Sequence, residues 1–213
     1  DFKKQYLNTG YPRNDVLFEM NNEKNIKELK EKMGLPTDKK VILYAPTWRK
    51  RNYFDMQLDI QDMQNRLGKD YIVILRLHHF SVAGLKEEML INNFVYNFSS
   101  YPTIQDLYLI SDILITDYSS VMFDFSILKR PMLFFTYDLE EYRDNLRGFN
   151  FDFEVLAPGP LLNNSDEVVN AILNIDDISE EYTDKYDRFV KQFTSYENGN
   201  ASEQITREVF KKQ

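Results

Sequence analysis

The sequence predicts an α/β protein with a doubly wound, Rossmann-like parallel sheet. Short apolar runs rich in β-branched and aromatic residues recur along the chain, and amphipathic helical patterns separate them. The runs are apolar at nearly every position, which suits strands buried on both faces, as in parallel sheets. Strands that alternate with helices favour βαβ units that place helices on both faces of the sheet.

Four of the apolar runs are expected to be strands: Val41–Ala45, Tyr71–Leu77, Asp112–Thr116 and Met132–Phe135. Four stretches show a helical pattern: Asn25–Met33, Leu58–Leu67, Thr103–Ile110 and Ser119–Leu128. Gly34 with Pro36, and Gly68, stop the first two helices. From about Asp166 onward the chain is expected to be mostly helical with acidic faces. We therefore expect one domain over residues 1–213, with C-terminal helices from about 166.

Composition narrows the possible functions. With 213 residues, 43% hydrophobic, the chain can form a sizeable core. A net charge of −8 argues against nucleic acid as a partner, because a broad basic surface is missing. Cysteine is absent, which excludes disulfides and thiolate metal sites. No stretch reaches the roughly 20 apolar residues that span a bilayer. The first residues, Asp1–Gln5, lack an initiator Met and a signal-peptide core, and are expected to follow a cut inside a longer protein.

Ligands of doubly wound sheets bind where the carboxyl ends of strands turn into helices. One such segment is Thr116-Asp117-Tyr118-Ser119-Ser120, which leads from a buried strand to a helix. Ser119 or Ser120 can cap that helix, and its first N–H groups can bind a diphosphate. The alternative is an N-cap without a ligand.

Two further segments follow strands. Ala45-Pro46-Thr47-Trp48-Arg49-Lys50-Arg51 brings the only Trp and three cations to a strand end, where Arg can pair with phosphate oxygens. The alternative is a solvated basic loop that Trp48 anchors.

Arg76-Leu77-His78-His79 contains the only two histidines, and one of them can bond a phosphoryl oxygen or transfer a proton. A zinc pair is the rival use. Adjacent histidines in an extended chain point to opposite faces, and no third His or Cys completes a site.

Other kinds of site find little support. The sequence has no G-x-S-x-G, P-loop or G-x-G-x-x-G motif. Asp112, Asp117 and Asp124 could suggest Mg²⁺, but Asp117 equally suits a helix start. We expect no protein-bound metal and no cofactor.

Together these motifs resemble the CDP-glycerol:polyglycerol phosphate glycerophosphotransferase family, which builds teichoic acid-type polymers. The order and spacing match from about Asn8 to Leu162. The motifs are Gly10-Tyr11-Pro12-Arg13-Asn14-Asp15, Ala45-Pro46-Thr47-Trp48-Arg49, Ser111-Asp112-Ile113-Leu114-Ile115-Thr116-Asp117-Tyr118-Ser119-Ser120, Arg130-Pro131, Asp138-Leu139 with Tyr142, Arg147-Gly148-Phe149 and Pro158-Gly159-Pro160, with a weaker similarity at Asn198-Gly199-Asn200-Ala201-Ser202. The family commonly has His-Pro where this chain has His78-His79, so His78 matches the functional histidine.

The resemblance implies the C-terminal, nucleotide-binding half of a GT-B-type two-domain transferase. The acceptor-binding domain, which is thought to carry a second essential histidine, would lie outside this chain. The implied reaction transfers the polyol phosphate of CDP-glycerol, or of CDP-ribitol, to a hydroxyl of a lipid-linked polyol-phosphate acceptor and releases CMP. The full-length protein would then associate peripherally with the cytoplasmic face of the cell membrane.

The motifs and the resemblance together define the expected site. His78 is the expected catalytic residue. The expected substrate- and nucleotide-binding residues are Arg13, Asn14, Thr47, Trp48, Arg49, Arg76, Thr116, Asp117, Ser119, Ser120, Asp124 and Arg147. Two rival hypotheses are a GT-B glycosyltransferase domain that uses a nucleotide sugar, and a non-catalytic nucleotide-binding or interaction module.

Overall fold

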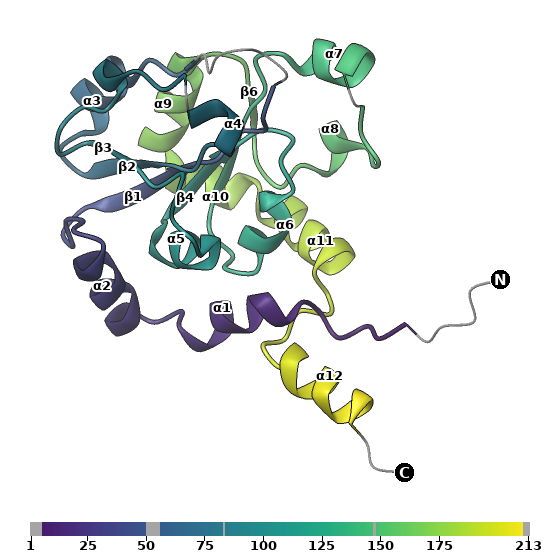
Figure 1. Cartoon of the computed structure of the whole chain (residues 1–213). Helices are drawn as coiled ribbons and strands as arrows, with labels where there is room; N and C mark the ends of the chain where they lie inside the picture. The colour runs from purple at the N-terminus through teal and green to yellow at the C-terminus, as the bar shows by residue number, and fades with distance from the viewer. Residues whose placement is uncertain (1–5, 50–55, 83, 147, 211–213) are drawn as a thin grey trace.

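The computed structural model describes residues 6–49, 56–82, 84–146 and 148–210. Six parallel strands form one sheet in the order β3-β2-β1-β4-β5-β6, and helices cover both of its faces (Figure 1). The strands are β1 (Lys40–Tyr44), β2 (Tyr71–Leu75), β3 (Val95–Asn97), β4 (Ile113–Thr116), β5 (Met132–Phe135) and β6 (Leu161–Leu162). The predicted α/β class with a Rossmann-like parallel sheet is confirmed.

Helices connect the strands and form the C-terminal part of the described chain. They are α1 (Asp15–Glu19), α2 (Glu23–Lys32), α3 (Ile60–Leu67), α4 (His79–Val82), α5 (Ile104–Ile110), α6 (Val121–Ser126), α7 (Leu139–Glu141), α8 (Phe153–Leu156), α9 (Ser165–Leu173), α10 (Ile175–Glu181), α11 (Thr183–Phe193) and α12 (Ala201–Val209). Two 3₁₀ turns, Pro12–Asn14 and Glu87–Met89, and a π-helical turn, Tyr142–Leu146, complete the elements.

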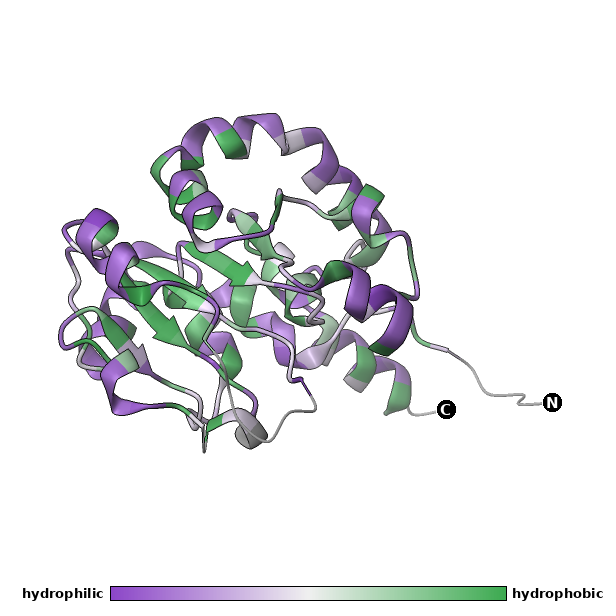
Figure 2. Ribbon diagram, turned by 90° about the horizontal axis from the view of Figure 1, so that it is seen from above, coloured by the Kyte–Doolittle hydropathy of each residue, from purple (hydrophilic) through white to green (hydrophobic). Residues whose placement is uncertain are grey.

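The core lies in two layers, one on each face of the sheet. Ile42 and Tyr44 of β1 pack with α3 and α9 on one face, whereas Val41 and Leu43 pack with α5, α6 and α11 on the other. All four side chains are buried, which explains why the run reads as continuously apolar. Figure 2 shows the strands as the most hydrophobic part of the ribbon, with hydrophilic residues on the outer helices.

The predicted boundaries agree with the structure to within about two residues. β5 has the predicted bounds, and Gly34, at φ +70°, follows α2 as the stop signal requires. The largest difference is α6, which spans Val121–Ser126 instead of Ser119–Leu128. The N–H groups of Leu128 and Lys129 bond three residues back, so the last turn is tighter than an α-helix. β3 and β6 were not predicted, because runs of three and two residues give too little pattern.

Candidate functional site

Strand order brings the three predicted loop segments together. β1 lies between β2 and β4, and Tyr44 is in register with both Leu75 and Ile115. The chain therefore leaves all three strands at the same edge of the sheet. Thr47 and Trp48 follow β1, Arg76 and His78 follow β2, and the Ser119–Ser120 turn follows β4.

A cleft of about 600 Å³ opens between these loops. Its volume lies within the roughly 300–1,000 Å³ that small-molecule sites usually have. The described residues that line it are Ala45, Pro46, Thr47, Trp48, Arg76, Leu77, His78, Ser99, Ile104, Tyr118, Ser119, Ser120, Val121 and Tyr142. Six of the expected site residues, Thr47, Trp48, Arg76, His78, Ser119 and Ser120, are therefore in one place.

Trp48 and His78 form an aromatic pair on one side of the cleft. Their ring centroids are 5.8 Å apart and the ring planes are tilted by 31°. The His78 side chain is exposed. The pair joins the loop after β1 to the loop after β2, so the position of Trp48 affects the surroundings of His78.

Arg76 contributes positive charge, and no described carboxylate forms an ion pair with it. Its Nη1 donates to the carbonyl oxygens of Phe98, Ser99 and Tyr101, at 3.2, 2.7 and 2.6 Å. In the part of the chain that the structure describes, Nε and Nη2 make no hydrogen bond to protein. The guanidinium is thus held by neutral acceptors and keeps N–H groups for an anion in the cleft.

Ser119 and Ser120 form the turn that leads into α6. Ser120 is the N-cap residue of α6, but its side chain makes no capping hydrogen bond. Among the described residues, neither hydroxyl bonds to another protein group. Capping therefore does not occupy these hydroxyls, and they line the cleft.

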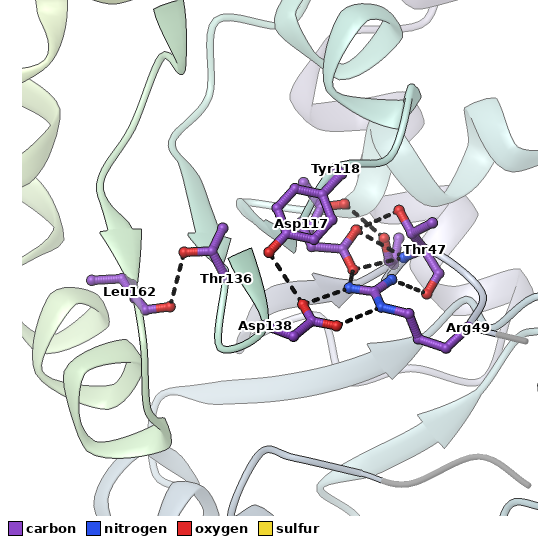
Figure 3. A network of polar contacts seen from close by, with 9 residues as sticks. Thr47, Arg49, Asp117, Tyr118, Thr136, Asp138 and Leu162 are labelled. Carbon is purple, nitrogen blue, oxygen red and sulfur yellow. Dashed lines mark hydrogen bonds and ion pairs between the residues drawn. The ribbon is translucent and has the colours of Figure 1, made fainter. Parts of the chain in front are cut away.

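Behind the cleft lies a buried polar network (Figure 3). Arg49 donates from Nε and Nη2 to Asp138, at 2.8 and 3.0 Å, and its Nη2 lies 2.9 Å from Asp117. Asp117 accepts hydrogen bonds from the backbone N–H and the hydroxyl of Thr47, at 2.8 and 2.6 Å. The hydroxyl of Tyr118 donates to Asp138 at 3.1 Å. Three strand ends, those of β1, β4 and β5, are joined in this way.

Burial and charge set the ionisation of this network. Burial alone would lower the pKa of Arg49, but the hydrogen bond to Asp138 and the charges of both aspartates raise it above its ordinary value. Arg49 is therefore permanently charged. For Asp117, burial raises the pKa, and the contacts with Arg49 and Thr47 oppose that rise without cancelling it.

The other expected residues that the structure describes lie outside the cleft lining. Asp124 on α6 accepts from Arg13 at 3.1 Å and from the buried Asn14 at 2.9 Å, which joins the N-terminal segment to α6. Thr116 is buried, and its hydroxyl donates to the carbonyl oxygen of Ala45. Arg147 lies outside the described residues. Substrate-binding roles for these five residues, and for Arg49 and Asp117, stay predictions.

Asp138, Tyr118 and Tyr142 were not among the expected site residues. Asp138 follows β5 at the same sheet edge as Asp117, so the rule that selected Asp117 would have selected it as well. Tyr118 and Tyr142 stack at 4.1 Å between ring centroids, and both line the cleft. They also line an adjoining cavity of about 660 Å³, whose other lining residues include Phe149 and Phe151.

Within 6–49, 56–82, 84–146 and 148–210, no group of three or more His, Cys, Asp or Glu residues could hold a metal ion. Over the same ranges, no helix is both long and apolar enough to cross a membrane.

Comparison with known proteins identifies the family. The profile of the CDP-Glycerol:Poly(glycerophosphate) glycerophosphotransferase family matches residues 1–211. The chain belongs to this family. It is 47% identical to the teichoic acid poly(glycerol phosphate) polymerase of Bacillus subtilis (strain 168), over 99% of this chain and 29% of that protein. It is 43% identical to the teichoic acid glycerol-phosphate transferase of Staphylococcus aureus (strain NCTC 8325 / PS 47), over 98% of this chain and 55% of that protein.

Solved structures of the wall teichoic acid polymerase TagF share the fold. A variant of the wall teichoic acid polymerase TagF, soaked with CDPG, superimposes with a TM-score of 0.86 and 41% identity. The match covers 95% of this chain and 50% of that one. The chain thus spans about half of the solved polymerase chain. It spans 29% of the Bacillus subtilis relative and 55% of the Staphylococcus aureus relative.

Proposed function

We propose that this chain binds a CDP-activated polyol, CDP-glycerol or CDP-ribitol, in the cleft beside Trp48 and His78. In the whole protein it would support transfer of the polyol phosphate to a hydroxyl of a growing teichoic acid-type polymer. The observation that carries the proposal is the convergence of Arg76, His78, Ser119 and Ser120 on one cleft in a chain of this family. The TagF structure soaked with CDPG supports a CDP-linked donor.

The chemistry of the cleft suits a diphosphate. The guanidinium of Arg76 supplies positive charge, and the hydroxyls of Ser119 and Ser120 supply donors that reorient toward phosphoryl oxygens. The adjoining cavity, which shares Tyr118 and Tyr142 with the cleft, gives space for the transferred group. Nucleotide and polyol phosphate can therefore lie side by side at one sheet edge.

Transfer requires little covalent chemistry from the protein. The acceptor hydroxyl attacks the β-phosphorus, the new O–P bond forms, the bond to the CMP oxygen breaks, and the acceptor proton leaves. The protein has to align the groups and stabilise the charge on the transferred phosphoryl group. In this proposal, His78 hydrogen-bonds that group or takes up the proton.

The proposal extends to the whole protein. The acceptor would be lipid-linked and would bind mainly through the part of the protein outside this chain. The protein would then work at the cytoplasmic face of the cell membrane, associated with it peripherally.

Calorimetric titration tests the ligand. CDP-glycerol, CDP and CMP are titrated into the chain, with UDP-N-acetylglucosamine and ADP as controls. Cytidine ligands should bind selectively, and binding should be lost in the double variant Ser119→Ala/Ser120→Ala and in His78→Ala. The control Ser100→Ala, an exposed serine outside the cleft lining, should bind normally. Preference for the uridine ligand would replace the proposal with a glycosyltransferase function.

Turnover tests the role of His78. In the full-length protein, His78→Ala should lower the rate by about 10²–10³, which is the usual cost of losing one preorganised donor. Circular dichroism should show an unchanged fold, because the side chain is exposed. Near-normal turnover would remove His78 from the mechanism.

A further inference from the structure

The guanidinium of Arg49 lies between two carboxylates. Figure 3 shows Asp117 and Asp138 converging on it from the ends of β4 and β5. The Arg49 side chain is 11% exposed, and those of Asp117 and Asp138 are 3% and 6% exposed. Nε, Nη1 and Nη2 all have partners within 3.0 Å, and Arg49 does not line the cleft.

Charge balance also argues against a direct contact between Arg49 and a phosphate. One guanidinium faces two carboxylates, so the ionised network carries a net negative charge. A diphosphate that reached Arg49 would have to displace Asp117 or Asp138 and leave that carboxylate buried without a counter-ion, which is costly. Arg76, bonded only to carbonyl oxygens, is the cation that an anion in the cleft can approach without this cost.

The same network holds the peptide on both sides of Trp48. Thr47 donates its N–H and hydroxyl to Asp117, and its carbonyl oxygen accepts from Nη1 of Arg49 at 2.7 Å. Trp48 is therefore flanked by two residues whose polar groups are bonded to buried partners. The network therefore fixes the position of the Trp48 ring, 5.8 Å from the ring of His78.

We infer that Arg49 is a positioning residue: through Asp117 and Asp138 it holds Trp48 against His78 and thereby shapes the cleft. Two tyrosines complete this arrangement. The Tyr118 hydroxyl bonds Asp138, and the rings of Tyr118 and Tyr142 lie 5.3 and 5.2 Å from the Arg49 guanidinium carbon. The consequence for CDP-glycerol binding rests on the proposed function, whereas the placement of Trp48 does not.

Tryptophan fluorescence measures the placement of Trp48 directly, because Trp48 is the only tryptophan in the chain. Asp138→Asn removes the Arg49–Asp138 ion pair and leaves the Arg49–Asp117 ion pair. Arg49→Lys keeps the charge, but one ammonium cannot reproduce the two-pronged bond to Asp138 together with the contacts to Asp117 and Thr47. Without any ligand, both variants should show red-shifted emission and faster acrylamide quenching. Asp144→Asn, which alters the exposed Arg143–Asp144 pair, is the control and should match the wild type.

Ligand binding separates positioning from direct contact. If Arg49 positions Trp48, Asp138→Asn weakens CDP-glycerol binding about tenfold, which corresponds to about 1.4 kcal/mol. The double variant Arg49→Lys/Asp138→Asn should then bind no worse than the weaker single variant, since both changes break one network. A direct contact predicts equal or tighter binding in Asp138→Asn, because Arg49 is released, and that result would overturn the inference.

Unchanged emission and quenching in unliganded, folded Asp138→Asn and Arg49→Lys would also overturn it. Far-UV circular dichroism confirms folding of each variant. Failure of the wild-type chain to bind CDP-glycerol would count against the proposed function alone, because the fluorescence comparison needs no ligand.

Discussion

Replacing Arg49 with Met should destabilise the protein strongly. The substitution keeps an unbranched side chain but removes the guanidinium, and it leaves Asp117 and Asp138 buried with no counter-ion. Breaking a buried ion pair from one side typically costs about 3–5 kcal/mol. That is a large part of the roughly 5–15 kcal/mol that stabilises a domain.

Arg143 provides a matched control. It makes the same kind of two-pronged contact, at 2.8 and 3.0 Å to Asp144, and a third contact at 2.9 Å to Glu154. Its side chain is 41% exposed, compared with 11% for Arg49. Arg143→Met should therefore leave stability unchanged, because solvent replaces the lost contacts.

Urea unfolding followed by circular dichroism measures both variants. The free energy of unfolding falls by about 2 kcal/mol per M of urea. The stability lost in Arg49→Met therefore corresponds to a urea midpoint roughly 1.5–2.5 M lower than that of the wild type. The double variant Arg49→Met/Asp138→Asn should recover part of the loss, since one of the two uncompensated charges is gone. Equal midpoints for Arg49→Met and Arg143→Met would refute the reasoning that burial decides the strength of these ion pairs.

Three further changes test other contacts. Glu197→Gln should raise stability at pH 7 by about 1 kcal/mol, because the amide removes the charge from a carboxyl group whose Oε2 is buried and unpaired. Burial raises the pKa of Glu197, so the wild type gains stability as pH falls through that value, and the difference in thermal midpoint should vanish near pH 3. Asp15→Asn should lower stability at pH 7 by about 0.5–1 kcal/mol, because the Asp15 carboxylate accepts hydrogen bonds from the first two N–H groups of α12. Those bonds outweigh burial and hold the pKa of Asp15 low, so their contribution to stability is present above about pH 4 and is lost as pH falls through the folded-state pKa. The urea midpoints of the variant and the wild type should therefore converge near pH 2. Gly159→Ala should lower the free energy of unfolding by about 3 kcal/mol or more, because a Cβ would lie 1.9 Å from the carbonyl oxygen of Met132. A thermal midpoint equal to that of the wild type would show that β5 and the segment containing Gly159 can move apart.

The sequence alone was sufficient for four of the six strands that the structure describes and for the edge of the sheet that carries the site. Runs such as Val41–Ala45 are apolar at every position, and only a strand covered on both faces requires that. The rule that ligands bind at the carboxyl ends of parallel strands then selected Trp48, His78 and Ser119, which the structure brings to one cleft. Both inferences rest on local sequence patterns, which can be read from consecutive residues.

What only the tertiary structure decided is the partner of each charged side chain. In the sequence, Arg49 and Arg76 are equivalent cations that follow neighbouring strands. The fold places two carboxylates against Arg49, one of them 89 residues away, and gives Arg76 only carbonyl oxygens. Whether a cation is neutralised depends on strand order and register, because these determine which loops meet, and no local pattern encodes that. Tertiary structure therefore separates a buried arginine that shapes the cleft from an arginine that an anion can reach.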